Sequence, residues 1–204
     1  MKKIFWILAM LLIIPMVGCA KQKSKSTKIE SIMNKKVLVT YFSHTGENYA
    51  VGYITKGNTH IIAEMIADET SGTLFEIEPV KEYPEDYNAC IDVAKKELQS
   101  KVRPAIKQDV KVEDYDVIFI GYPNWWGDMP MAVYTFIEKH NWAGKTVIPF
   151  CTHEGSGLSN TPSHIAKACE GATVGKGLAI QGSVAQNSQS SARKSVQTWI
   201  AGMK

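Results

Sequence analysis

The sequence predicts an α/β domain of three layers, in which a doubly wound, five-stranded parallel sheet is covered by helices on both faces. Two observations carry this prediction. Strand-like and helix-like segments alternate from residue 36 onward. The segment 117–120, Val-Ile-Phe-Ile, is a continuous apolar run, which is typical of a central parallel strand buried on both faces. Together they favour parallel strands joined by covering helices.

The expected strands are short segments rich in β-branched and aromatic residues, most of them followed by Gly, Pro or hydroxyl residues. In chain order they are 37–42, 74–77, 117–120, 146–150, and a Gly-interrupted fifth strand at 173–174 and 177–180.

The expected helices have apolar residues at helical spacing between the strands. Asn58 and Thr59 offer an N-cap for the first helix. The second runs from Pro84 to Pro104, where the proline stops it. The remaining helices are expected at 131–139, from Ser159 or Ser163 to Cys169, and at 190–203.

Charge is distributed unevenly along the chain. The first 35 residues hold seven lysines and a single acidic residue, Glu30, whereas residues 36–204 hold 16 Lys and Arg against 19 Asp and Glu. The expected domain, 36–204, therefore carries a net charge of −3, which argues against a nucleic-acid partner.

Residues 1–19 have the features of a signal peptide. Two lysines precede the uncharged stretch 4–17, which is shorter than the roughly 20 residues of a membrane-spanning helix. Met16-Val17-Gly18-Cys19 resembles a bacterial lipobox, with Met16 where Leu is usual. We expect lipidation of Cys19 and an extracytoplasmic protein anchored to the cell membrane; an uncleaved anchor or an ordinary secretory signal is the alternative.

Residues 20–35 are expected to be a flexible, Lys-rich tether, because Lys alternates with Gln, Ser and Thr without an apolar period. A flexible chain of this length reaches on the order of 20 Å. Its lysines would contact anionic lipid head groups or remain solvated.

The cysteines beyond Cys19 are Cys90, Cys151 and Cys169. Their odd number and the absence of Cys-x-x-Cys spacing indicate neither a zinc site nor a disulfide framework. We expect buried free thiols, and no metal site is predicted.

The first loop, residues 43–46, directly follows the first strand and has the residues of a phosphate-binding turn. Ser43 and Thr45 supply hydroxyl groups, and successive backbone N–H groups can converge on one anion. Gly46 has no side chain to hold the backbone away from that anion.

The tryptophan loop, residues 121–130, follows the third strand. Its adjacent Trp125 and Trp126, in a Gly- and Pro-rich segment, suit contact with a flat heteroaromatic ring. Asn124 could hydrogen-bond such a ring. Alternatively, one Trp packs on the protein and the other covers a hydrophobic edge.

The glycine loop, residues 151–158, follows the fourth strand. Gly155 and Gly157 allow close backbone approach to a ligand. His153 titrates near neutral pH and would contact a substrate or ring, or only Glu154 or the backbone. No catalytic residue is assigned.

These three motifs resemble the flavodoxin-like family found in many anaerobic bacteria, over about residues 36–200. The resemblance implies a sheet of strand order 2-1-3-4-5 and non-covalent FMN. Phosphate contacts would come from Ser43, His44, Thr45, Gly46 and Asn48, with Asn58 and Thr59 closing the pocket. Ring contacts would come from Pro123, Asn124, Trp125, Trp126 and Gly127 on one side and His153, Glu154, Gly155 and Gly157 on the other.

Two features depart from classical flavodoxins. Residues 47–57 insert a Tyr- and Gly-rich stretch after the first loop, and the domain is less acidic than those proteins. The insertion is expected to fold over the phosphate or the ribityl chain.

Three functions remain open from the sequence. The first is an FMN electron carrier tethered to the membrane surface, with a redox protein or a small molecule as its partner. The second is an FMN-dependent reductase that uses NAD(P)H and a quinone-type acceptor. The third is a binding lipoprotein that has kept the fold and lost the flavin.

Overall fold

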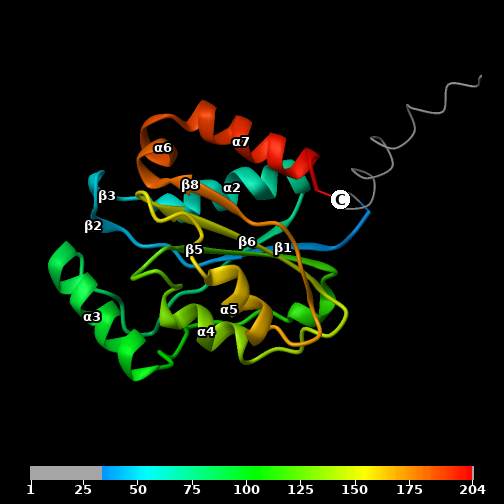
Figure 1. The fold of residues 1–204 in the computed structure, drawn as a ribbon, viewed down its shortest axis with the longest axis horizontal. Helices are drawn as coiled ribbons and strands as arrows, with labels where there is room; N and C mark the ends of the chain where they lie inside the picture. The colour runs from blue at the N-terminus through cyan, green and yellow to red at the C-terminus, as the bar shows by residue number, and fades with distance from the viewer. Residues whose placement is uncertain (1–33, 204) are drawn as a thin grey trace, which may run out of the picture.

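The computed structural model describes residues 34–203, which form a central sheet between two layers of helices (Figure 1). The predicted signal peptide with Cys19, and the predicted tether as far as residue 33, lie outside the described residues and stay predictions. Among residues 34–203, none of the helices has the length and apolar character needed to cross a membrane.

The main sheet has the predicted order. Its strands run β4-β1-β5-β6-β7, β8 also pairs with β6, and all of these pairs are parallel. This confirms the order 2-1-3-4-5, with the fifth strand divided in two. The strands are β1 (Val37–Tyr41), β4 (Thr73–Glu76), β5 (Val117–Pro123), β6 (Thr146–His153), β7 (Thr173–Val174) and β8 (Leu178–Gln181).

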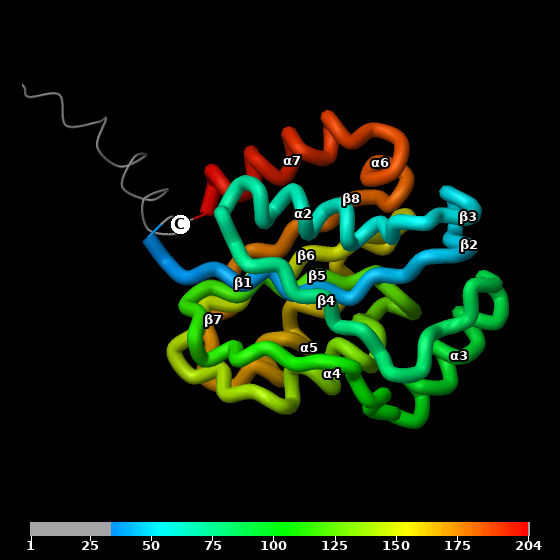
Figure 2. Tube along the Cα trace, turned by 180° about the vertical axis from the view of Figure 1, so that it is seen from behind, coloured from blue at the N-terminus to red at the C-terminus, as the bar shows by residue number. Residues whose placement is uncertain are grey.

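The helices divide between the two faces of the sheet, as Figures 1 and 2 show. One layer contains α2 (Asn58–Thr70), α6 (Gly182–Asn187) and α7 (Gln189–Ala201). The other contains α3 (Tyr87–Ser100), α4 (Met131–Ile137) and α5 (Thr161–Ala168), with a short 3₁₀ turn at Val112–Asp114.

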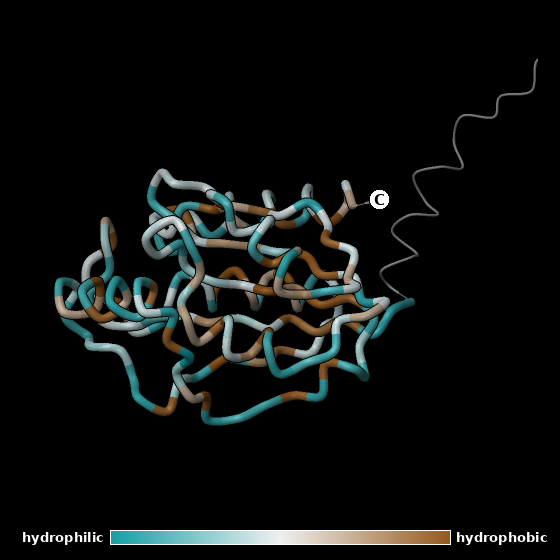
Figure 3. The backbone as a smooth tube through the Cα atoms, turned by 60° about the horizontal axis from the view of Figure 1, so that its bottom comes forward, coloured by the Kyte–Doolittle hydropathy of each residue, from teal (hydrophilic) through white to brown (hydrophobic). Residues whose placement is uncertain are grey.

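Alternate residues of the central strands enter two different core clusters. On β5, Val117 and Phe119 pack with α2 and α7, whereas Ile118 and Ile120 pack with α4 and α5. A strand covered on both faces has no polar side, which explains its unbroken apolar sequence. Figure 3 shows hydrophobic stretches running through the middle of the molecule as well as on the helices that cover it.

Several helix boundaries differ from the expected ones, and three of the differences have a local reason. Gly57, and not Asn58 or Thr59, is the N-cap of α2. The second helix begins at Tyr87, because the side chain of Asp86 accepts a hydrogen bond from the N–H of Ala89 (2.8 Å). Before α7 lies α6, whose six residues are too few to show a helical period.

The inserted stretch forms a hairpin of its own, β2 (Gly46–Asn48) paired antiparallel with β3 (Gly52–Ile54). It packs on the segment before α3, where the N–H of Glu47 donates to the carbonyl of Glu85 (2.8 Å).

The three described cysteines, Cys90, Cys151 and Cys169, are buried and form no disulfide, as expected. Burial raises the pKa of each thiol to about 12, which keeps it protonated at neutral pH.

Gly121→Ala should destabilise the fold. Gly121 on β5 lies beside Phe150 on β6, and an added Cβ would stand 2.1 Å from the Phe150 ring. Overpacking of this kind costs about 1–3 kcal/mol in the free energy of unfolding, measured by urea denaturation.

The matched control for Gly121→Ala is Gly202→Ala, where the nearest atoms are 3.4 Å away and φ is −88°. It should change the free energy of unfolding by less than about 0.5 kcal/mol. Equal stability of the two variants would contradict this account of the β5–β6 packing.

Candidate functional site

The loops after β1, β5 and β6 meet at the carboxyl edge of the sheet, where open α/β sheets bind ligands. A cavity of about 270 Å³ opens there. It brings together eight of the predicted site residues: Asn48, Asn58, Pro123, Asn124, Trp125, Trp126, His153 and Glu154.

The first loop lies against the N-terminus of α2. The hydroxyl of Ser43 accepts a hydrogen bond from the N–H of His60 in the first turn of that helix (3.1 Å). A Cβ on Gly57 would stand 2.1 Å from the Ser43 oxygen and 2.7 Å from the His44 carbonyl. The absence of a side chain at Gly57 therefore lets the helix end approach the loop. Free N–H groups and the helix dipole favour an anion at such a place.

His44 contributes a buried polar atom that has no partner among the described residues, namely its Nε2. Burial lowers the pKa of His44 below its ordinary value of 6.5, against the opposing effect of Glu85. Leaving such a nitrogen unpaired costs about 1–3 kcal/mol, so a ligand acceptor at this point would offset the penalty.

The structure gives a further reason for a glycine at position 46, besides the predicted close approach of an anion. Its φ is +85°, and an added Cβ would stand 2.8 Å from the Cα and the carbonyl oxygen of Glu85. Gly46 therefore allows the β2–β3 hairpin to close on Glu85, and the amide of Asn48 donates back to the Gly46 carbonyl (3.2 Å). Thr45 is exposed in the same loop.

The side chains of Asn58 and Thr59 lie in different environments, although the two residues are adjacent in the sequence. Asn58 lines the cavity, and its side-chain oxygen accepts a hydrogen bond from Gln186 (2.8 Å). Thr59 is 1% exposed, and its hydroxyl bonds to the hydroxyl of Thr152 on β6 (2.8 Å). The hydroxyl of Thr59 thus ties α2 to the sheet, and Thr59 does not line the cavity; its expected part in closing the ligand pocket stays a prediction.

The two tryptophans have unlike environments. Trp125 meets the rings of Phe42 (5.4 Å between centroids), Tyr83 (5.1 Å) and His44 (5.7 Å), all in edge-on geometry. Trp126 is 50% exposed. Trp125 thus packs partly on the protein, as the alternative interpretation expected, while both side chains line the cavity.

Trp126 is held in place from α3. Its indole N–H donates to the carbonyl of Ile91 (3.0 Å), and the ammonium group of Lys95 lies 4.9 Å from the ring centre. Its φ is +56°, a left-handed conformation that is strained for a bulky side chain.

The side chain of Asn124 forms hydrogen bonds with other groups of the protein. Its amide nitrogen donates to the Gly157 carbonyl (2.7 Å) and to the Ser159 hydroxyl (2.9 Å), and its side-chain oxygen accepts from the N–H of Gly127 (3.1 Å). The Asn124 side chain therefore links the tryptophan loop to the glycine loop; Asn124 also lines the cavity, and its predicted ring contact stays a prediction.

The glycine loop is fixed by its own polar side chains. Nδ1 of His153 accepts a hydrogen bond from the N–H of Gly155 (2.8 Å), the backbone role that the sequence left open. Glu154 accepts from the N–H (2.6 Å) and the hydroxyl (3.1 Å) of Ser183 at the start of α6. Gly155 and Gly157 have φ of +117° and +60°, conformations that favour glycine.

The sequence missed the wall that α3 gives to the cavity. Tyr87, Ile91 and Ala94 line it, together with Tyr49 from the hairpin. The spacing of 87, 91 and 94 had marked one face of a helix, and a helix face facing a ligand looks the same in sequence as one facing the core. Tyr49 and Tyr87 lie with ring centres 6.1 Å apart, so the insertion does reach the cavity.

A parallel sheet of this order, with these loops at its carboxyl edge, defines the flavodoxin-like class of α/β proteins. The sequence model of the family described as flavodoxin matches residues 36–201. The chain belongs to the flavodoxin family.

Solved structures agree with this assignment. A protein designated a flavoprotein from Bacteroides eggerthii is 32% identical, with a TM-score of 0.65 over 82% of this chain and 96% of its own. The corresponding values for one from Bacteroides uniformis are 34%, 0.63, 81% and 97%.

A flavoprotein from Lactobacillus acidophilus, solved in complex with FMN, is 25% identical, with a TM-score of 0.56 over 73% of this chain and 94% of its own. No curated protein matches the chain.

His44 should make the stability of the ligand-free protein depend on pH. Its lowered pKa means that, just below pH 6.5, the unfolded chain binds a proton that the folded chain does not. The free energy of unfolding should therefore fall as the pH drops through about 6.5. His44→Gln should flatten this slope in urea denaturation.

The slope should not vanish in His44→Gln, because burial also lowers the pKa of His153. An unchanged slope in the variant would show that His44 is not held neutral by burial.

Proposed function

We propose that the chain binds FMN without a covalent bond and carries electrons at a membrane surface. The observation that carries the FMN assignment is the first loop closed against α2. In this loop, Nε2 of His44 has no partner among residues 34–203, and the His44 ring lies against Trp125, a side chain that lines the aromatic cavity. The FMN bound to the Lactobacillus acidophilus flavoprotein, a relative over most of this chain, supports it.

The phosphate of FMN would be bound by the first loop and the start of α2. Thr45 would donate its exposed hydroxyl, and His44 would donate from Nε2. Ser43 would orient the helix end by its bond to the N–H of His60. Hydrogen bonds from these residues and the dipole of α2 would stabilise the negative charge of the phosphate there.

The flat ring would lie in the cavity between the tryptophan and glycine loops. The aromatic side chains available to exclude water from it are Tyr49, Tyr87, Trp125 and Trp126. FMN supplies one-electron and two-electron redox chemistry at this ring when bound. The protein then needs to bind, orient and shield, and no acid–base residue is required.

The membrane proposal rests on the sequence. The lipobox ending in Cys19 and the Lys-rich segment that follows it support a lipid-anchored protein outside the cytoplasm. Lipid attachment at Cys19 would hold the flavin domain close to the membrane surface.

A reductase that uses NAD(P)H is a second candidate, because the cavity opens beside the exposed Tyr49 (64%) and Trp126 (50%), where a substrate could reach the ring. Stopped-flow mixing of the FMN-loaded protein with NADH and NADPH separates the two. The carrier proposal predicts no rapid loss of flavin absorbance and no quinone turnover. Rapid bleaching with turnover would establish the reductase instead.

Thr45→Val should weaken FMN much more than riboflavin, because only FMN has the phosphate that this hydroxyl would bind. A hydrogen bond to a charged group contributes about 1.5–3 kcal/mol, so the Kd for FMN should rise about 10- to 100-fold. Fluorescence titration measures the Kd for FMN and the Kd for riboflavin.

For this comparison, Thr73→Val, an equally exposed threonine at the start of β4, is the matched control and should bind both ligands as the wild type does. Equal losses of FMN and riboflavin affinity in Thr45→Val would refute the phosphate assignment. Absence of FMN binding by the wild-type protein would favour the flavin-free alternative.

Cys19→Ser should release the protein from membranes. In a bacterium that processes lipoproteins, the wild-type chain should incorporate labelled fatty acid and sediment with the membrane fraction, because Cys19 carries the lipid. The variant should lose the label, whereas Cys90→Ala, which removes a buried thiol, should keep it. Labelling of Cys19→Ser at the wild-type level would exclude this anchor.

A further inference from the structure

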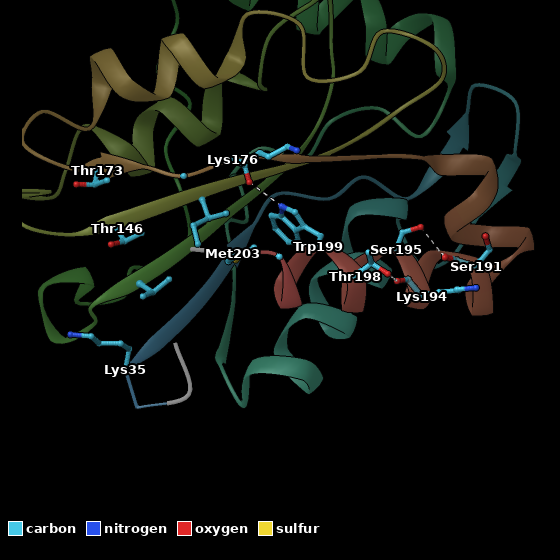
Figure 4. Close-up of a pocket in the computed structure, with 14 residues that line it drawn as sticks. Lys35, Thr146, Thr173, Lys176, Ser191, Lys194, Ser195, Thr198, Trp199 and Met203 are labelled. Carbon is cyan, nitrogen blue, oxygen red and sulfur yellow. Dashed lines mark hydrogen bonds between the residues drawn. The ribbon is translucent and has the colours of Figure 1, made fainter. Parts of the chain in front are cut away.

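A larger cavity, of about 1090 Å³, lies at the edge of the sheet opposite the FMN site. We call it the basal groove. Its walls include the amino ends of β5, β6 and β7, at Val117, Thr146 and Thr173, and one face of α7. In the close-up of Figure 4, Trp199 lies near the middle, and the side chains of Lys35, Lys176 and Lys194 extend outward at different points of the rim.

The lining of the basal groove combines apolar and cationic groups. Its apolar surface includes Ile148, Trp199 and Met203, and its cationic groups are Lys35, Lys176 and Lys194. No carboxylate lines the groove, and none of these lysines forms an ion pair among residues 34–203. Such a site suits a molecule with an anionic head and an apolar body.

The positive charge of the groove is a local property. Residues 36–204 carry a net charge of −3, so the domain as a whole does not attract anions. The indole N–H of Trp199 donates to the carbonyl of Lys176 (2.9 Å), which fixes the segment between β7 and β8 against α7. The cationic rim and the apolar floor are therefore held together by the fold.

We propose that the basal groove binds anionic phospholipid. Lys176 and Lys194 contact the phosphate of the head group, and Trp199 and Met203 contact the first part of the acyl chains. Each lysine near an anionic membrane surface contributes about 1 kcal/mol, and Trp is suited to the boundary between head groups and chains.

The basal groove lies at the edge of the sheet where the predicted tether joins the domain, so lipid bound there would orient the domain on the membrane. Lys35, which continues into the predicted tether, lines the groove together with Met203 near the C-terminus, and both ends of the described chain lie at this edge (Figures 1 and 2). The FMN site lies at the carboxyl ends of the same strands. Lipid in the groove would turn the FMN cavity away from the membrane, toward a soluble partner. The binding itself requires neither FMN nor lipidation of Cys19.

Vesicle sedimentation with residues 34–203, which contain the whole sheet and both core clusters, tests the proposal. The protein should bind vesicles of phosphatidylglycerol and should not bind vesicles of phosphatidylcholine. Lys176→Gln/Lys194→Gln should weaken the binding roughly 30-fold, from about 1 kcal/mol for each lysine.

Lys81→Gln/Lys96→Gln is the matched control, because it removes two exposed lysines near α3 and changes the net charge equally. Its binding should equal that of the wild type. Met203→Glu, after the end of α7, should also weaken binding, since it places a carboxylate at the apolar floor. Inorganic phosphate at constant ionic strength should not compete.

Three results would overturn the proposal. No binding to phosphatidylglycerol vesicles would remove it directly. Equal losses in the two double variants would show that only net charge matters. Displacement by inorganic phosphate would show a site for a soluble anion and not for a lipid.

Discussion

The close approach of α2 to the first loop is the constraint on which the candidate site depends. A side chain at Gly57 would collide with the Ser43 hydroxyl and the His44 carbonyl, so only glycine lets the helix end reach the loop. That approach places the Ser43 oxygen on the N–H of His60 and leaves the remaining N–H groups of the helix start near the loop. It coincides with the burial of Nε2 of His44, which has no partner among residues 34–203.

The other two loops are made rigid by side chains that the sequence had assigned to the ligand. Asn124 joins the tryptophan loop to Gly157 of the glycine loop and to the adjacent Ser159 through two hydrogen bonds, and accepts a third from Gly127 within its own loop. Glu154 attaches the glycine loop to α6. A cofactor site benefits from this arrangement, because loops that are already ordered lose little conformational entropy when a ring binds between them. Asn124 and Glu154 thus act as supports for the loops, and the aromatic part of the cavity wall comes from Tyr49, Tyr87, Trp125 and Trp126.

The sequence was sufficient for the fold because each strand carries its own local signal. Apolar runs such as 117–120, and turns rich in glycine and hydroxyl groups, gave the strands, and the motifs of the first, tryptophan and glycine loops gave the strand order by resemblance. Contacts between distant segments were not accessible in this way. The bond between Thr59 and Thr152 and the wall formed by Tyr87 and Ile91 depend on how elements pack in three dimensions, and no local pattern encodes that. The role of Gly57 had one local signal in the sequence, namely its position directly before the expected start of α2.

The central claim is that the junction of the first loop and α2 forms the phosphate site. Its most direct test is fluorescence titration of Gly57→Ala with FMN and with riboflavin. The added methyl group must push the helix end away from Ser43 and His44. The Kd for FMN should then rise about tenfold or more, from the loss of one or more hydrogen bonds to a charged group. Riboflavin, which has no phosphate, should bind as it does to the wild type. Wild-type FMN affinity in Gly57→Ala would contradict the claim.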